Sequence, residues 1–171
     1  MNAIDDIKKI LRNADFTQFK EAIYDYNINE FDKFGNNILH YYVLNSKDIS
    51  LDCREVIGFL LSSGIDINTK QPSGQFQRTP LQQAVVMNLR DIFDFLLTKG
   101  ADVNATDRNG NSILSNAVFN YLKDKPNYEY YINSLLEYGA DPHKENNYGH
   151  SAYASANQYD NSDVRKLFVN C

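Results

Sequence analysis

Apolar residues recur at the spacing of one buried helix face in four segments of the chain. Within each segment they fall at positions i, i+3 and i+4, the pattern of a helix that packs one side against a core. The four stripes are Val56, Ile57, Leu60 and Leu61; Ile92, Phe93, Leu96 and Leu97; Ile132, Leu135 and Leu136; and Val164, Leu167 and Phe168. The pattern predicts four short amphipathic helices of one design.

Pairs of glycines recur along the chain, with ten residues from the first glycine of each pair to the second. A glycine follows each of the first three stripes, and another comes ten residues later, giving Gly64 and Gly74, Gly100 and Gly110, and Gly139 and Gly149. Asp25 stands ten residues before Gly35, in a degraded fourth copy. Glycine suits the left-handed backbone that ends a helix. The repeated spacing therefore predicts an internal repeat.

A further helix is predicted to begin soon after each second glycine. An oxygen-bearing side chain precedes an apolar start at Asn37, Thr79, Ser112 and Ser151. Such an oxygen can accept hydrogen bonds from the free amides of the first turn. Pro80 stands at a first helical position, where its missing N–H costs nothing.

Asp or Asn is predicted to lie between the two helices of each unit. Both residues tolerate left-handed backbone and can cap the helix that follows. The positions are Asp52, Asn88, Asn127 and Asp160. The unit is therefore a turn, a short helix and a second short helix.

The N-terminal segment predicts one more helix pair. One stripe is formed by Ile4, Ile7, Ile10 and Leu11, and a second by Phe16, Phe19, Ile23 and Tyr26. Asp15 is placed to cap the second helix. A terminal unit of a repeat array needs one polar outer surface, and the charged residues around both stripes fit that need.

These motifs resemble the ankyrin repeat. The resemblance rests on Asp107–Leu114, on Arg78–Leu81 and on Leu96–Asn104, and it covers nearly the whole chain. It implies an all-α solenoid of paired antiparallel helices with β-turn fingers at right angles to them. The histidine of the family motif is present as His40 and replaced elsewhere by Gln82, Ser115 and Ala154.

The resemblance implies a single domain, 1–171, of five units. They are an N-terminal cap at 1–31, full repeats at 32–70, 71–106 and 107–144, and a C-terminal cap repeat at 145–171. Extra residues are expected between paired helices, near 45–50 and in 121–131, and in the finger at 75–78. The four tyrosines of 121–131 are either an accessory contact patch or the cover of a lengthened helix pair, and we favour the second interpretation.

Composition narrows the class of protein. Of the 171 residues, 43% are apolar and 23% charged, as in ordinary globular domains. The net charge of −5 disfavours nucleic-acid binding and fits a basic partner. No apolar run approaches a bilayer span, and the N-terminus lacks the features of a signal peptide. Two cysteines make no disulfide framework. We therefore expect a cytoplasmic monomer that contacts neither membrane nor nucleic acid.

Catalysis and metal binding have little support in the sequence. His143 and His150 bracket one finger without a further ligand at suitable spacing. Cys53 stands at a predicted helix start, but no histidine is placed to activate it. By the resemblance, His40 holds neighbouring turns through hydrogen bonds. We expect no catalytic residue, no metal and no cofactor, and thus a protein that is not an enzyme.

The resemblance also implies a contact surface for a protein partner, on the concave face built by fingers and first helices. Neighbouring units there present variable positions side by side on a rigid frame. Carried over one by one, the contact positions are Lys33, Phe34, Asn36, Leu44 and Asn45; Gln75, Phe76, Arg78, Val86 and Met87; Arg108, Asn109, Asn111, Phe119 and Asn120; and Tyr148, His150, Gln158 and Tyr159. Large rings and arginine favour an interface, although Phe34 and Phe119 could instead pack between repeats. Phe76 is the strongest candidate.

The functional prediction is a non-catalytic protein–protein interaction module that acts by occlusion or scaffolding. The Asn- and Tyr-rich composition resembles that of proteins from AT-rich bacterial genomes, and some bacterial ankyrin proteins of this size are similar to immunity proteins that neutralise a cognate toxin. Two alternatives stay open. One is an effector or regulatory adaptor that binds a host protein; the other is a substrate of asparagine hydroxylation at Asn68 or Asn104.

Overall fold

The computed structural model describes residues 4–13, 15–158 and 162–169. Two predicted positions, Tyr159 and Asp160, lie outside these residues. Within them the chain is all-helical, with no β-strand. The helices are α1 Ile4–Asn13, α2 Phe16–Tyr24, α3 Ile38–Asn45, α4 Cys53–Ser62, α5 Pro80–Val86, α6 Arg90–Thr98, α7 Ile113–Asn120, α8 Lys125–Glu137, α9 Ala152–Gln158 and α10 Ser162–Lys166, with 3₁₀ turns η1 Ser46–Asp48 and η2 Tyr121–Lys123.

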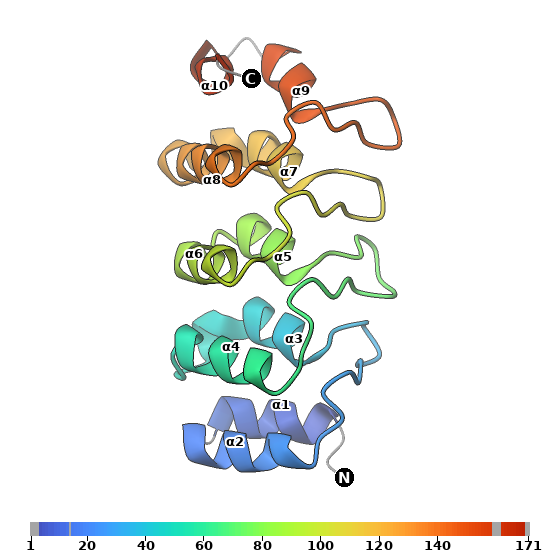
Figure 1. Ribbon diagram of the computed structural model, residues 1–171, viewed down its shortest axis with the longest axis vertical. Coiled ribbons are helices and arrows are strands. Elements are labelled where there is room, and N and C mark those ends of the chain that lie inside the picture. The colour runs from blue at the N-terminus through green and yellow to red at the C-terminus, as the bar shows by residue number, and fades with distance from the viewer. Residues whose placement is uncertain (1–3, 14, 159–161, 170–171) are drawn as a thin grey trace.

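Helix pairs stack along the long axis of the molecule, and the loops between pairs project to one side (Figure 1). The first helices of the pairs, α1, α3, α5, α7 and α9, pack on one another in that order. The second helices, α2, α4, α6, α8 and α10, form the other layer. We call the projecting loops fingers 1 to 4, at residues 25–37, 63–79, 99–112 and 138–151. The chain is the all-α solenoid that the repeat predicts.

Helix starts follow the predicted caps. The side chains of Asn37, Thr79 and Ser112 accept hydrogen bonds from amides in the first turns of α3, α5 and α7. The Ser151 hydroxyl accepts from the Ala154 amide at 3.1 Å. Each oxygen satisfies a donor that the helix leaves free. These four predictions are confirmed.

The turns between paired helices depart from the prediction in the third full repeat. Asp52 caps α4 as expected, and Asn88 is left-handed with a φ of 55°. Asn127 does not lie between helices, because α8 begins at Lys125 and Asp124 caps it. The inserted residues form η2 and lengthen α8, so the turn lies earlier than the repeat spacing predicts.

One continuous hydrophobic core runs through the stack. All but three members of the four predicted stripes are buried; Leu61, Leu136 and Leu167 are partly exposed at its edge. Because each unit buries its apolar face only against its neighbours, adjacent units stabilise one another.

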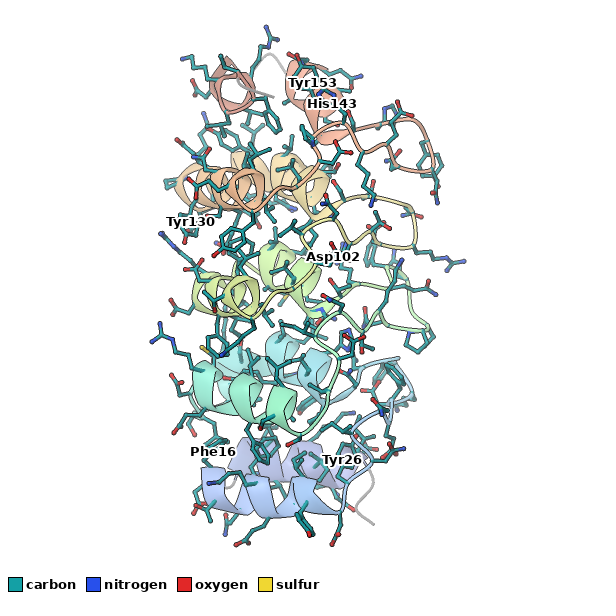
Figure 2. All side chains as sticks on the ribbon, in the orientation of Figure 1. Phe16, Tyr26, Asp102, Tyr130, His143 and Tyr153 are labelled. Carbon is teal, nitrogen blue, oxygen red and sulfur yellow. The ribbon has the colours of Figure 1, made fainter. Side chains whose placement is uncertain are left out.

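The tyrosines of 121–131 pack in this core or against it and do not form an exposed contact patch. Tyr121, Tyr128 and Tyr131 are at most 3% exposed. The Tyr131 hydroxyl donates to Asn88 Oδ1 at 2.9 Å, across the boundary between repeats. Tyr130 lies between α6 and α8 (Figure 2), where its hydroxyl donates to Asp94 at 2.8 Å and the Arg90 guanidinium stacks 3.5 Å from its ring. The lengthened-pair interpretation is therefore the right one.

His40 links two units in the way that the resemblance implies. Its ring is fully buried, with Nδ1 2.7 Å from Asn37 Oδ1 and Nε2 3.1 Å from the Arg78 carbonyl oxygen. Burial lowers the pKa of His40 from 6.5 to about 4, against the opposing effect of the Arg78 and Thr69 backbone and of Asp32. Gln82, the equivalent residue one repeat later, donates to the Asn111 carbonyl oxygen at 3.3 Å.

Candidate functional site

Polar side chains fix the shape of the fingers. In fingers 1, 3 and 4 one side-chain oxygen accepts hydrogen bonds from the amides two and four residues later, at 2.8 to 3.0 Å. The accepting residues are Asp32, Asp107 and Asn146. Backbone amides of these three fingers thus find hydrogen-bond partners inside the loop, which stabilises the loop conformation.

Neighbouring fingers also hold one another. The Arg108 amide donates to the Phe76 carbonyl oxygen at 2.7 Å, and the Asn147 amide donates to the Asn109 carbonyl oxygen at 3.0 Å. Gly110 has a φ of +80°, and a Cβ built there would lie 2.9 Å from the Asn147 nitrogen. Only glycine allows this approach without a shift of the backbone. Fingers 2, 3 and 4 therefore form one connected edge.

The two asparagines considered for hydroxylation take part in this linkage. Asn68 Oδ1 accepts from the Asp102 amide at 2.8 Å, and Asn104 Oδ1 accepts from the Asp141 amide at 2.8 Å. The Asn104 amide group also donates to the Gly139 carbonyl oxygen at 3.1 Å. Both side chains therefore connect neighbouring units.

Two hollows lie between the fingers and the first helices. The N-terminal hollow has a volume of about 320 Å³ and spans fingers 1 and 2 with α3 and α5. The C-terminal hollow has a volume of about 690 Å³ and spans fingers 2 to 4 with α5, α7 and α9. Phe76, Arg78 and Val86 line both. We call this joined surface the finger-side face.

Most of the predicted contact residues line these hollows. The N-terminal hollow contains Phe34, Asn36, Leu44, Gln75, Phe76, Arg78, Val86 and Met87. The C-terminal hollow adds Asn111, Phe119, Asn120, His150 and Gln158. Lys33, Asn45, Arg108, Asn109 and Tyr148 line neither, and Tyr159 lies outside the described residues.

Phe76 and Arg78 form the wall between the hollows. The Arg78 guanidinium carbon lies 4.1 Å from the centre of the Phe76 ring. Its Nε is buried and has no hydrogen-bond partner among the described residues. Burial lowers the pKa of Arg78, and the charge of Asp107 partly opposes that shift. The backbone of Arg78 is fixed, since its amide donates to Gln71 Oε1 at 3.1 Å.

The other aromatic rings among the predicted contact residues project into solvent. Phe34, Phe119 and Tyr148 are 63%, 69% and 71% exposed. Packing between repeats would bury these rings, so that interpretation does not hold for Phe34 or Phe119. Large rings exposed beside a hollow are a feature of contact surfaces.

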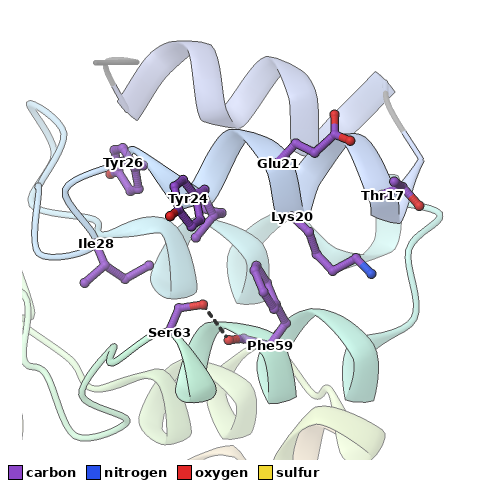
Figure 3. Close-up of a pocket in the computed structure, with 9 residues that line it drawn as sticks. Thr17, Lys20, Glu21, Tyr24, Tyr26, Ile28, Phe59 and Ser63 are labelled. Carbon is purple, nitrogen blue, oxygen red and sulfur yellow. Dashed lines mark hydrogen bonds between the residues drawn. The ribbon is translucent and has the colours of Figure 1, made fainter.

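A third hollow of about 810 Å³ lies elsewhere, between α2 and α4 (Figure 3). We call it the back groove. It is lined by Thr17, Lys20, Glu21, Ile23, Tyr24, Tyr26, Ile28, Phe59 and Ser63. Sequence reasoning missed it, because the stripes of α2 and α4 predict core positions and not the spacing between the helices. A sequence signal for it is Tyr24, an aromatic residue next to Ile23 of the predicted stripe, and the structure leaves this residue 89% exposed.

Metal-ligand clusters and reactive nucleophiles were also sought among the described residues. They contain no cluster of three His, Cys, Asp or Glu side chains able to hold a metal ion. The His143 ring packs on Tyr153, with centroids 4.7 Å apart. Burial raises the pKa of the Cys53 thiol, which disfavours the reactive thiolate. None of the described helices combines the length and apolar character needed to cross a bilayer.

Comparison with known proteins identifies the repeat. A sequence model of ankyrin repeats in three copies matches residues 7–107, more than half of the chain. No curated protein matches the chain. The matched segment begins within α1 and contains α2 to α6 with fingers 1 and 2, and the same helix–helix–finger unit continues through α7 to α10. The chain belongs to the ankyrin repeat family.

Proposed function

We propose that this chain is a non-catalytic protein-binding module that holds its partner on the finger-side face. Ankyrin repeats in general support protein–protein interaction. The observation that carries the proposal is the junction of two hollows at Phe76 and Arg78 of finger 2 and Val86 of α5, beside fingers that are hydrogen-bonded to one another.

The physical basis is a surface already fixed before the partner arrives. Ordering loops on binding costs free energy, and the fingers are held by their own bonds. Exposed Phe34 and Phe119 flank the junction and would lose contact with water when covered. Rings and an arginine beside a hollow are the residue types that dominate binding energy in protein interfaces.

In its finer form the proposal makes the chain an immunity protein whose partner is a bacterial toxin domain. Neutralising a toxin by covering its active site needs tight, persistent contact, and a preformed face supplies this with small ordering costs. This role requires no chemistry from the immunity protein itself.

Photo-cross-linking tests the location of the site. We expect p-benzoylphenylalanine at position 119 to capture one specific protein in the native source. The same group at position 24, in the back groove and more exposed, should not capture it. Both variants should keep a wild-type circular dichroism spectrum.

The location of the site and the immunity role can each be contradicted by a separate result. Capture of the partner from position 24 and not from position 119 would contradict the finger-side face. If the captured protein is harmless when produced alone, the immunity form is wrong and the binding function stands. Toxicity that this chain abolishes on co-expression would support the immunity form.

A further inference from the structure

We propose that the finger-side face recognises an acidic segment of its partner: a carboxylate side chain that pairs with Arg78, next to an apolar residue that packs against Phe119 and Val86. This inference rests on the proposed function and specifies the chemistry of the partner.

The charged residues that line the hollows of this face have a net charge opposite in sign to that of the whole chain. The net charge is −5, yet α3, α5, α7 and α9 contain no charged residue. Acidic side chains such as Glu55, Asp91 and Glu129 lie exposed on the second helices instead. A partner segment that enters the hollows meets the charges of their lining, which differ from the net charge of the chain.

The charged side chains that line the two hollows are mostly cations. Arg78 is the one charged residue among the described lining of the N-terminal hollow. The C-terminal hollow is lined by Arg78 and Lys123, with one carboxylate, Asp107. Asp107 is 3% exposed and already accepts hydrogen bonds from the Asn109 amide and from the Asn111 amide and side chain. It therefore offers little to an incoming cation.

Arg78 is prepared to bind a carboxylate. Its guanidinium group is stacked on Phe76, and within the described residues no carboxylate forms an ion pair with it. The group has lost part of its water through burial, as its lowered pKa reflects, and the charge of Asp107 offsets this loss only in part. A carboxylate of the partner can accept two parallel hydrogen bonds from the guanidinium group and place a negative charge beside it.

The second cation and the apolar contact lie along the same hollow. Lys123 Nζ donates to Asn120 Oδ1 at 2.7 Å and lies 5.8 Å from the centre of the Phe119 ring. Phe119 is exposed and Val86 is half-buried, so an apolar side chain can cover both. A basic segment would instead place its charge beside Arg78 and Lys123, which is unfavourable.

Peptide titrations followed by NMR test the preference. The probes are N-acetyl-Phe-Glu-Phe amide and its matched peptides with Gln or Lys in the centre, added to the ¹⁵N-labelled protein. We expect the Glu peptide to shift the amides of 76–78 and 115–123 and the Nε–H of Arg78. The Gln peptide should bind at least about tenfold more weakly, since one charge-assisted contact is lost.

Substitutions give the matched control. Arg78→Gln should remove the preference for Glu over Gln, whereas Arg54→Gln, an exposed change on α4, should preserve it. The inference is overturned if the Lys peptide binds as tightly as the Glu peptide, if the shifts centre on the back groove, or if no peptide shifts the finger-side face.

The two proposals fail in different ways. Capture of a partner from position 119, together with equal binding of the Glu and Gln peptides, would leave protein binding intact and reject the acidic preference. Capture from position 24 alone would reject the proposed site, whatever the peptides show.

Discussion

Replacing Tyr131 with alanine should lower the free energy of unfolding by about 4 kcal/mol, the usual cost of deleting a large buried ring. The ring is fully buried, lies edge-on to Phe93 with centroids 4.8 Å apart, and contacts Tyr128 at 5.5 Å. Its hydroxyl holds Asn88, whose amide group donates to Asp124 at 2.9 Å. One side chain thus joins α8 to α6 and to the turn before α6.

Urea unfolding followed by circular dichroism at 222 nm measures this loss. The matched control is Tyr138→Ala, at the end of the same helix, where the ring is 53% exposed and the expected change is within about 0.5 kcal/mol. Tyr131→Phe keeps the ring and loses one hydrogen bond, at a cost of about 1 kcal/mol. Equal effects of Tyr131→Ala and Tyr138→Ala would contradict the described boundary between repeats.

The second large effect concerns pH. Burial of the neutral ring lowers the pKa of His40 to about 4, while the unfolded chain takes up that proton near 6.5. Below 6.5 the unfolded state therefore binds more protons than the folded state. The stabilisation that depends on a neutral His40 is complete above pH 6.5 and is lost as pH falls towards 4, by up to about 3 kcal/mol.

His40→Gln isolates this contribution from the other groups that titrate in acid. Gln82 occupies the same place one repeat later and bridges to a backbone carbonyl, so glutamine fits the position. We expect the stability of the wild type to fall more steeply between pH 6.5 and 4 than that of the variant. Parallel curves, or an NMR titration that protonates the folded His40 ring near pH 6.5, would contradict the burial argument.

Local signals predict much of this fold because each acts within a few residues. A cap such as Thr79 and a glycine such as Gly100 position helix ends through their own bonds and backbone angles. Repetition then fixes the architecture, since identical units stack in one way. The error at Asn127 arose where an insertion broke the spacing, although Asp124 and Pro126 are themselves signals for an earlier start.

The sequence predicts which positions contribute to the candidate site. It does not predict how their side chains are arranged into one surface. The family pattern indicates Phe76, Arg78 and Phe119 as contact positions, and the structure brings them to connected hollows. The stacking of Arg78 on Phe76 and the enclosure of Asp107 depend on how finger 2 meets finger 3, which no local pattern encodes. For the same reason the net charge of the chain predicts a basic partner, whereas our proposal of an acidic segment rests on the local positions of Arg78 and Lys123.

The dissociation constant of the partner captured from position 119 is the most direct test of the central claim, which is that this chain works by contact through the finger-side face. It should be measured for the wild type, for Phe76→Ala with Arg78→Ala, and for Tyr24→Ala as the back-groove control. We predict that the double variant weakens binding by at least about 100-fold, while Tyr24→Ala leaves it unchanged. An unaltered dissociation constant in a double variant with a native circular dichroism spectrum would contradict the account.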